Sequence, residues 1–192
     1  MPDREADRAR SIYLGPWRID LTRRAGVPRL LPDTVLARSI AAALEAAGAP
    51  SPASIGLILA DDSELAGLNL THMSVTGPTD VLSFPLLPPG AFPEHRGRGV
   101  RVAIRPTSFV LPPGRRLHLG DIVVSVERAI DQARAGRGGQ TGDMAWLPAD
   151  ELRLLVTHGA LHVCGWDHAE PVEEAAMRAL ERALLDGGLG VA

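Results

Sequence analysis

The segment that most constrains this chain runs from Thr157 to His168 and reads T-H-G-A-L-H-V-C-G-W-D-H. His158 and His162 are four residues apart, so on a helix they lie one turn apart on the same face. Gly165 can end that helix in a left-handed turn, because it has no Cβ atom to clash. The spacing therefore predicts a helix that presents two imidazoles, followed by a turn that presents His168 as a third.

Three neutral imidazoles are a ligand set that suits zinc and that nickel or copper would also accept. Such a set leaves a fourth position for water, whose pKa zinc lowers from roughly 15.7 to about 7. We therefore expect one catalytic zinc ion per chain, held by His158, His162 and His168. The alternative is three ordinary histidines, but half of the chain's six histidines fall in this one short segment.

The motif lacks one residue that zinc peptidases need. Their pattern H-E-x-x-H puts a glutamate after the first histidine as general base, and the metzincins extend it to H-E-x-x-H-x-x-G-x-x-H. This chain keeps the histidine and glycine spacing but has Gly159 at the glutamate position. Cys164 is two residues after His162, which turns it off the histidine face, so we expect a small buried side chain. The sequence thus predicts a zincin-like metal helix without the peptidase base.

Length and composition indicate one folded unit. Of the 192 residues 45% are apolar and 22% are charged, which is ample for one hydrophobic core. We expect residues 1–10 to be a disordered tail and residues 11–192 to form a single metalloprotein domain. The net charge of −3 gives no global attraction for nucleic acid, so a basic surface would have to be local.

The cellular compartment follows from cysteine usage and from the absence of long apolar runs. One cysteine excludes an internal disulfide framework and is typical of a reducing compartment. No segment approaches the roughly 18 apolar residues of a membrane span. The N-terminus carries charges of both signs and lacks the apolar centre of a signal peptide. The sequence therefore predicts a cytoplasmic protein with no membrane partner.

Strand-like and helix-like segments alternate along the chain, which indicates an α+β fold with a small mixed β-sheet packed with helices. The segment 78–85 is bracketed by prolines, which is typical of an edge strand or of a strand that starts at a turn. Further strands are expected at 17–21, 55–60 and 120–125. Helices are expected at 33–47, 61–69 and 126–136, with the metal helix starting at 148.

A last helix is expected at 171–185. Glu174 and Arg178 are four residues apart, so they should form an ion pair on its surface. Its core-facing stripe is expected to consist of Val172, Ala176, Leu180 and Leu184.

A long connection rich in Arg, Pro and Gly spans about 86–117, and a short hairpin arm is possible within it at 100–104. Connections of this length without regular structure are usually functional or disordered. Arginines there could pair with phosphates, and the alternative is a solvated surface insertion. The candidate phosphate-binding residues, which the resemblance described next makes candidates for RNA binding, are Arg96, Arg98, Arg101, Arg105, Arg115 and Arg116.

Four segments together carry a resemblance: H-G-A-L-H-V-C-G-W-D-H at 158–168, P-T-D-V-L-S-F-P at 78–85, L-G-D-I-V-V-S at 119–125 and L-N-L-T at 68–71. With them the chain resembles the YbeY family of bacterial metal-dependent endoribonucleases, which act in ribosomal RNA maturation. The order and spacing of elements match over roughly residues 12–186. The resemblance implies that His158, His162 and His168 are the metal ligands, in a cleft of a small mixed sheet packed with helices.

The expected activity is hydrolysis of a phosphodiester in single-stranded ribosomal RNA, in maturation and quality control of the ribosome. Either the water on the metal is the nucleophile, or the metal polarises a phosphate oxygen. The implied partners are that RNA and the ribosome or its small-subunit proteins. Asp80, Asp121 and Asp167 are candidates for a general base or for hydrogen bonding to the ligands, and structural caps at turns or strand ends are their alternative role.

Two departures from the family pattern matter. The family usually has an arginine a few residues after the Leu-Asn pair, and Met73 occupies that position here. Loss of a cation beside a scissile phosphate would remove stabilisation of its transition state. The second departure is the length of the Arg-rich connection, whose arginines could replace the missing cation.

Two other functions remain open from the sequence. One is a ribosome-assembly factor with weak catalysis, which Met73 favours. The other is a zinc hydrolase of another class, such as a peptidase or amidase, which Gly159 argues against because the base would have to come from elsewhere.

Overall fold

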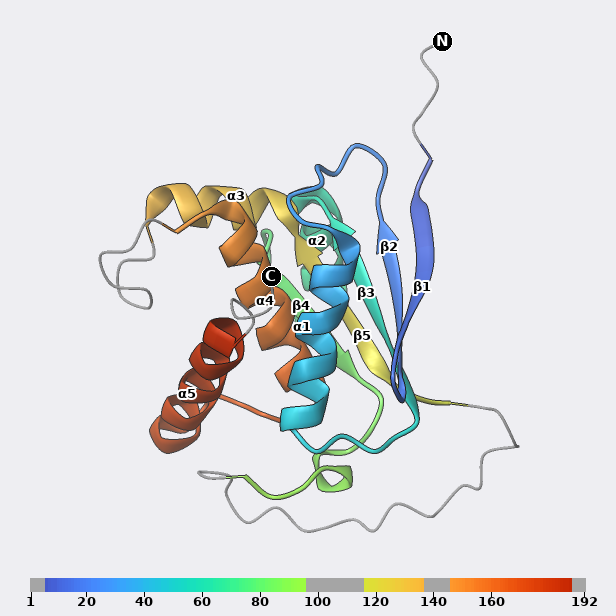
Figure 1. Cartoon of the computed structure of the whole chain (residues 1–192). Helices are drawn as coiled ribbons and strands as arrows, with labels where there is room; N and C mark the ends of the chain where they lie inside the picture. The colour runs from blue at the N-terminus through green and yellow to red at the C-terminus, as the bar shows by residue number, and fades with distance from the viewer. Residues whose placement is uncertain (1–5, 96–115, 137–145, 188–192) are drawn as a thin grey trace.

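The computed structural model describes residues 6–95, 116–136 and 146–187, and within them five strands form one sheet in the order β1-β2-β3-β5-β4 (Figure 1). β1 with β2 and β4 with β5 are antiparallel, whereas β2, β3 and β5 run parallel to one another. The sheet is therefore mixed, as the sequence predicted. The strands are β1 (Arg8–Leu14), β2 (Trp17–Arg23), β3 (Ala53–Ala60), β4 (Val81–Pro85) and β5 (Leu117–Ser125).

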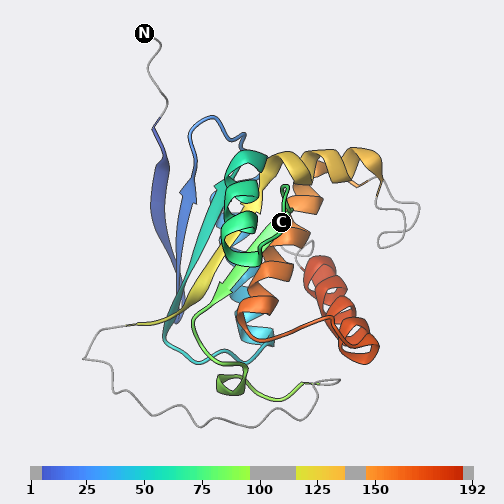
Figure 2. The ribbon, with the colours of Figure 1, turned by 180° about the vertical axis from the view of Figure 1, so that it is seen from behind.

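Helices cover both faces of the sheet. α1 and α4 lie on one face and α2 on the other (Figures 1 and 2). Buried side chains of α1 and α4 join one core with β2, β3 and β5, while Leu65 of α2 packs against Leu82 and Val123 in a second core. No helix of the described residues has the length and apolar character of a membrane span. The helices are α1 (Asp33–Ala46), α2 (Asp62–Leu68), α3 (Val126–Ala135), α4 (Pro148–Val163) and α5 (Pro171–Gly187), with a π-turn η1 (Asn69–Met73) and a 3-10 turn η2 (Pro89–Ala91).

Local signals explain where several of these elements begin. Asp61 caps α2 by accepting a hydrogen bond from the Glu64 N–H, and Ser125 caps α3 by accepting one from the Arg128 N–H. β4 lies at the edge of the sheet, as its flanking prolines predicted. These signals confirm the predicted alternation of strands and helices.

The first strand corrects the expected tail. β1 begins at Arg8, so residues 8–10 belong to the sheet, and residues 1–5 lie outside the described part of the chain. The sequence gives little signal for this strand, because Ile12 is its only buried residue. Its backbone pairs with β2 across the turn at Gly15, which has a φ of +57°. Backbone pairing, rather than an apolar face, fixes this strand.

The last helix corrects the expected core stripe. Val172 is 63% exposed, whereas Glu173, Met177 and Glu181 form the buried stripe. Leu180 and Leu184 still pack against the core from partly buried positions. Compared with the expected orientation, the helix is rotated about its axis so that both glutamates face inward. Each of them has a polar partner beside the candidate metal centre described below. The surface pair between Glu174 and Arg178 is confirmed at 2.5 Å.

The long connection is only partly described. Residues 96–115 lie outside the described residues, and with them the expected hairpin arm and the candidates Arg96, Arg98, Arg101, Arg105 and Arg115. The connection ends one residue earlier than predicted, because Leu117 already belongs to β5. Arg116 contacts the ring of Tyr13 on β1, with its guanidinium carbon 5.5 Å from the ring centroid.

Candidate metal centre

The helix α4 carries the first two histidines toward β4. It starts at Pro148, and Asp150 accepts a hydrogen bond from the Leu147 N–H, which closes the first turn. Gly165 follows with a φ of +82°, as the motif predicted. The Trp166 N–H then donates to the Leu161 carbonyl over 3.1 Å, so the chain reverses and brings His168 back to the helix.

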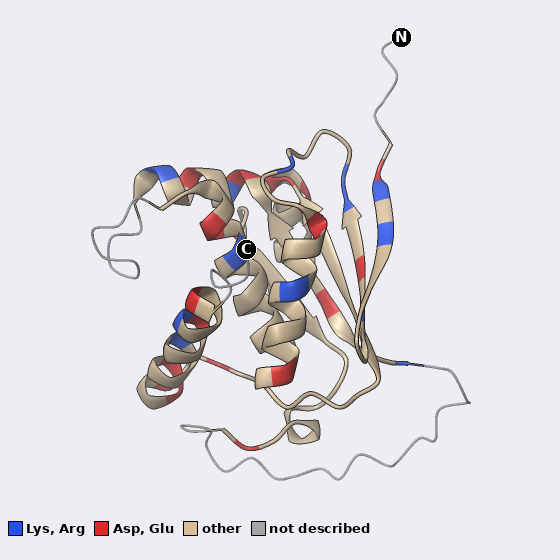
Figure 3. Ribbon diagram, viewed as in Figure 1, with Lys and Arg blue, Asp and Glu red and all other residues tan. Residues whose placement is uncertain are grey.

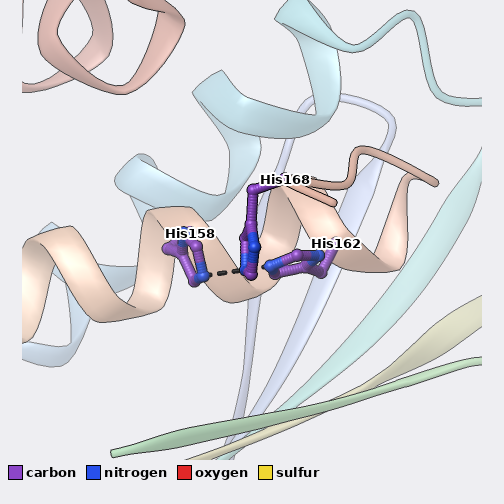
Figure 4. A group of neighbouring side chains, drawn as sticks. All are labelled: His158, His162 and His168. Carbon is purple, nitrogen blue, oxygen red and sulfur yellow. Dashed lines mark hydrogen bonds between the residues drawn. The ribbon is translucent and has the colours of Figure 1, made fainter. Parts of the chain in front are cut away.

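The three imidazoles converge on one point (Figure 4). One ring nitrogen from each of His158, His162 and His168 lies within 4.8 Å of the other two. The Nε2 atoms of His158 and His162 are 3.0 Å apart. Two nitrogen ligands of a tetrahedral zinc ion, each about 2.0–2.1 Å from it, are roughly 3.3 Å apart. The three residues therefore form a possible metal site.

The second nitrogens of two rings decide which atoms face the site. Nδ1 of His162 is 2.9 Å from the Trp166 carbonyl, and Nδ1 of His158 is 2.7 Å from Oε1 of Glu181. A carbonyl oxygen accepts only, and a carboxylate accepts when ionised, so both Nδ1 atoms carry the proton. Both Nε2 atoms then direct lone pairs into the same space, where a cation relieves their repulsion. This donor set fits a metal ion.

Burial keeps His162 neutral. Burial, with the nearby charges of His158 and His168, lowers the pKa of His162 to about 4, although the Trp166 carbonyl and Asp167 act in the opposite direction. His162 is therefore unprotonated at neutral pH, which is the form that binds a metal. Cys164 is 1% exposed in the core, and burial raises the pKa of its thiol to about 12, as expected of a structural side chain.

Two cavities adjoin the histidines and share His158, His168, Asp80 and Val81. The first has a volume of about 470 Å3 and is also lined by His162, Asp167, Met73 and residues of β4. The second has a volume of about 360 Å3 and lies against α5. The metal centre therefore stands at the junction of the two cavities.

The three candidate aspartates have different positions. Asp80 lines both cavities, and its carboxylate accepts hydrogen bonds from the Val81 N–H and from Gln132, as a strand cap would. Asp167 lines the first cavity, and its carboxylate accepts from the His168 N–H at 2.7 Å. Asp121 is not among the described residues that line either cavity, and its carboxylate is 3.2 Å from Nε2 of His118. Asp80 and Asp167 are thus brought to the site, and Asp121 is not.

The position of the peptidase glutamate is closed by packing. A Cβ atom on Gly159 would lie 2.6 Å from Cγ2 of Ile122 and 3.1 Å from Cγ2 of Val81. The Gly159 carbonyl accepts a hydrogen bond from the Ser83 hydroxyl at 3.1 Å. The helix therefore presses directly onto β4 and β5 here. A side chain at this position would force the Ile122 side chain to shift.

Sequence reasoning missed Glu181, Glu173 and His95. Oε1 of Glu173 accepts from the Asp167 N–H and lies 3.5 Å from Nε2 of His95, whose ring stacks on Trp166 with centroids 3.8 Å apart. Glutamates four residues either side of Met177 were a usable signal for the first two. His95 had none, because it lies in the long connection, more than 60 residues before the histidine motif.

Comparison with known proteins places these observations in a family. The model of the family described as Endoribonuclease YbeY matches residues 30–187. The Endoribonuclease YbeY of Thermobifida fusca is 37% identical over 175 residues, which are 88% of this chain and 92% of that protein. That of Roseiflexus castenholzii is 36% identical over 159 residues, which are 82% of this chain and 84% of that protein.

A solved structure supports the fold. The solution structure of TM1509 from Thermotoga maritima superposes with a TM-score of 0.51 at 20% identity, covering 91% of this chain and 89% of that one. At this identity the likeness concerns the fold alone. The family model and the two relatives carry the assignment, so this chain belongs to the YbeY endoribonuclease family, which hydrolyses phosphodiester bonds of RNA.

Proposed function

We propose that this protein is a zinc-dependent endoribonuclease that cuts single-stranded ribosomal RNA during maturation and quality control of the ribosome. Family membership implies an RNA substrate. The observation that carries the proposal is the convergence of His158, His162 and His168 beside an open cavity, with outer hydrogen bonds that direct Nε2 of His158 and of His162 inward. Ribosomal proteins of the small subunit are the proposed partners, and the cytoplasm is the proposed location.

A bound zinc ion supplies a Lewis acid and makes hydroxide available near neutral pH. The residues of the chain orient the histidines and accept protons. His158 and His162 keep their orientation through Glu181 and the Trp166 carbonyl, which also raises their basicity as ligands. Asp167 and Asp80 line the cavity beside the ligands and are the candidates to accept a proton there.

The test is cleavage of a labelled single-stranded ribosomal RNA fragment by zinc-loaded protein. We expect cleavage by the native chain and loss of it in His162→Ala and in a chelated sample. His118→Ala is the matched control, because His118 contacts Ser54 and Asp121 rather than the centre. Cleavage that persists in His162→Ala or in chelator would contradict the proposal. Elemental analysis of protein purified without added metal distinguishes zinc from nickel or copper.

A second function, a ribosome-assembly factor with weak catalysis, is favoured by Met73. This side chain lines the first cavity at the end of η1, where the family pattern is expected to have an arginine. Asn69 holds the loop that follows, because its amide donates to the Gly77 carbonyl at 2.9 Å. An arginine at 73 would bring a cation to the cavity wall and stabilise charge on a reacting phosphate.

Met73→Arg separates the two functions. If the native chain is a weak catalyst, we expect Met73→Arg to raise kcat by roughly tenfold or more, the scale of one electrostatic contact in a transition state. Met73→Gln, similar in size but uncharged, is the control. An equal rate in the native chain and Met73→Arg, with efficient cleavage by both, would exclude the assembly-factor alternative.

A further inference from the structure

The second cavity lies where α5 approaches the metal centre. Its lining combines the buried floor of Leu155 and Met177 with His158, His168 and Val81, which also line the first cavity. Arg178 and Glu174 stand at its edge, with side chains 49% and 39% exposed. Figure 3 shows basic and acidic positions close together on α5.

Each carboxylate of this cavity already has a partner. Glu181 accepts from His158 at 2.7 Å, and Asp80 accepts from the Val81 N–H at 2.9 Å and from Gln132 at 3.0 Å. Glu174 is paired with Arg178 at 2.5 Å. Such an exposed pair four residues apart on a helix is weak and is easily exchanged for a stronger anion.

Arg178 is the only arginine among the described residues that line either cavity. A guanidinium matches phosphate oxygens with two parallel hydrogen bonds, and the half-exposed side chain of Arg178 is accessible to such a group. A polynucleotide cut in the middle must continue on both sides of the reacting phosphate. The two cavities adjoin at His158, His168, Asp80 and Val81.

We propose that the second cavity is a subsite for the RNA strand on one side of the cleaved bond, and that Arg178 binds a backbone phosphate there. Glu174 competes with that phosphate for the guanidinium. This inference rests on the proposed endoribonuclease function and adds the position of the strand to it. Arg178 is a substrate-binding residue, distinct from the metal ligands.

The experiment measures the Kd of zinc-loaded protein for a labelled single-stranded oligoribonucleotide at several salt concentrations. Arg178→Gln should weaken binding several-fold and reduce the slope of log K against log salt by about 0.7, the contribution of one phosphate on a single strand. Glu174→Gln should tighten binding, because it releases Arg178 and removes a negative charge. Arg182→Gln, the same charge change on an exposed residue one turn further along α5, should change neither quantity appreciably.

The subsite is supported if Arg178→Gln raises the Kd, Glu174→Gln lowers it and Arg182→Gln changes it little. Equal effects of Arg178→Gln and Arg182→Gln on the Kd would indicate a non-specific effect of the charge of α5 and would overturn the subsite. An absence of RNA binding by the native chain would overturn it as well. Zinc content and far-ultraviolet circular dichroism of each variant confirm the intact centre. If the native chain binds RNA in this pattern without cleaving it, the nuclease proposal fails, and only the binding of an RNA phosphate by Arg178 stands. Normal cleavage with an unchanged Kd and KM in Arg178→Gln rejects the subsite alone.

Discussion

At the scale of single residues, Gly159 shows how the packing of one α-carbon limits the chemistry of the centre. Its missing side chain lets α4 contact Ile122 of β5 and Val81 of β4, and a Cβ atom would come within 2.6 Å of Ile122. A glutamate base at this position would need space that the sheet occupies. The absence of the peptidase base is therefore built into the contact between helix and sheet.

Gly159→Ala tests this contact through the sign of the change in the free energy of unfolding. Alanine usually stabilises a helix interior over glycine by about 1 kcal/mol. We expect Gly159→Ala instead to lower the free energy of unfolding by about 1–3 kcal/mol, the range for overpacked cores. Gly67→Ala in α2 is the matched control, because a Cβ atom there would meet nothing within 4 Å, and it should stabilise the protein. Urea unfolding measures both, and stabilisation by Gly159→Ala would refute the close contact.

Glu181 is a second residue whose effect, here on zinc affinity, can be measured separately. Its carboxylate accepts from Nδ1 of His158, which makes the opposite nitrogen a better ligand. We expect Glu181→Gln to weaken zinc binding by roughly tenfold or more, as for other hydrogen-bond partners of metal ligands. Competition with a chromophoric chelator gives the affinity. Glu170→Gln, an exposed residue before α5, should leave it unchanged, and equal affinities in all three proteins would remove Glu181 from the centre.

At the scale of elements, the turn after α4 is braced from outside the motif. The ring of His95 is stacked on Trp166 at an angle of 8° between planes, and Glu173 of α5 accepts from the Asp167 N–H. Trp166 in turn holds His162 through its carbonyl. The connection and α5 thus meet on the segment that places His168.

His95→Ala should loosen this turn while leaving all three ligands in place. We expect faster zinc release to a chelator, by a smaller factor than in Glu181→Gln, because His95 acts through Trp166 rather than directly on one of the three histidines. Trp166 fluorescence should also change on removal of the stacked ring. His72→Ala is the control, since His72 contacts Phe84 edge-on instead. Release rates identical to those of the native chain would show that the stack does not brace the turn.

At the scale of the whole molecule, the buried His162 couples stability to pH. Its pKa is about 4 in the folded chain against 6.5 for an ordinary histidine, so the unfolded chain binds the extra proton between these values. The metal-free protein should therefore lose stability as pH falls from about 6.5 toward 4, and should show no such dependence on His162 above that window.

Urea unfolding of chelated protein between pH 4.5 and 7 measures this dependence. His162→Gln, which cannot titrate, should show a shallower loss over the same window than the native chain. Parallel curves for the two proteins would contradict the shifted pKa of His162. Added zinc should stabilise the native chain most at neutral pH, because the ligands must be unprotonated to bind it.

Features that depend on local spacing could be predicted from the order of the residues alone. Four-residue separation placed His158 and His162 on one helical face, and Gly165 ended the helix where a left-handed turn was needed. Caps at Asp61 and Ser125 and the prolines around β4 fixed further boundaries. Each of these signals acts over a few residues and can therefore be recognised in the sequence.

The folded structure was needed to show which distant segments contact one another. It showed that β1 is held by backbone pairing, that α5 turns Glu173 and Glu181 inward, and that His95 reaches Trp166. The expected stripe was wrong at Val172, which is exposed, although Leu180 and Leu184 do pack against the core, because α5 turns Glu173 and Glu181 toward polar partners. Hydrogen bonds between residues far apart in sequence leave no periodic trace, so the surroundings of the three histidines become visible only once the chain has folded.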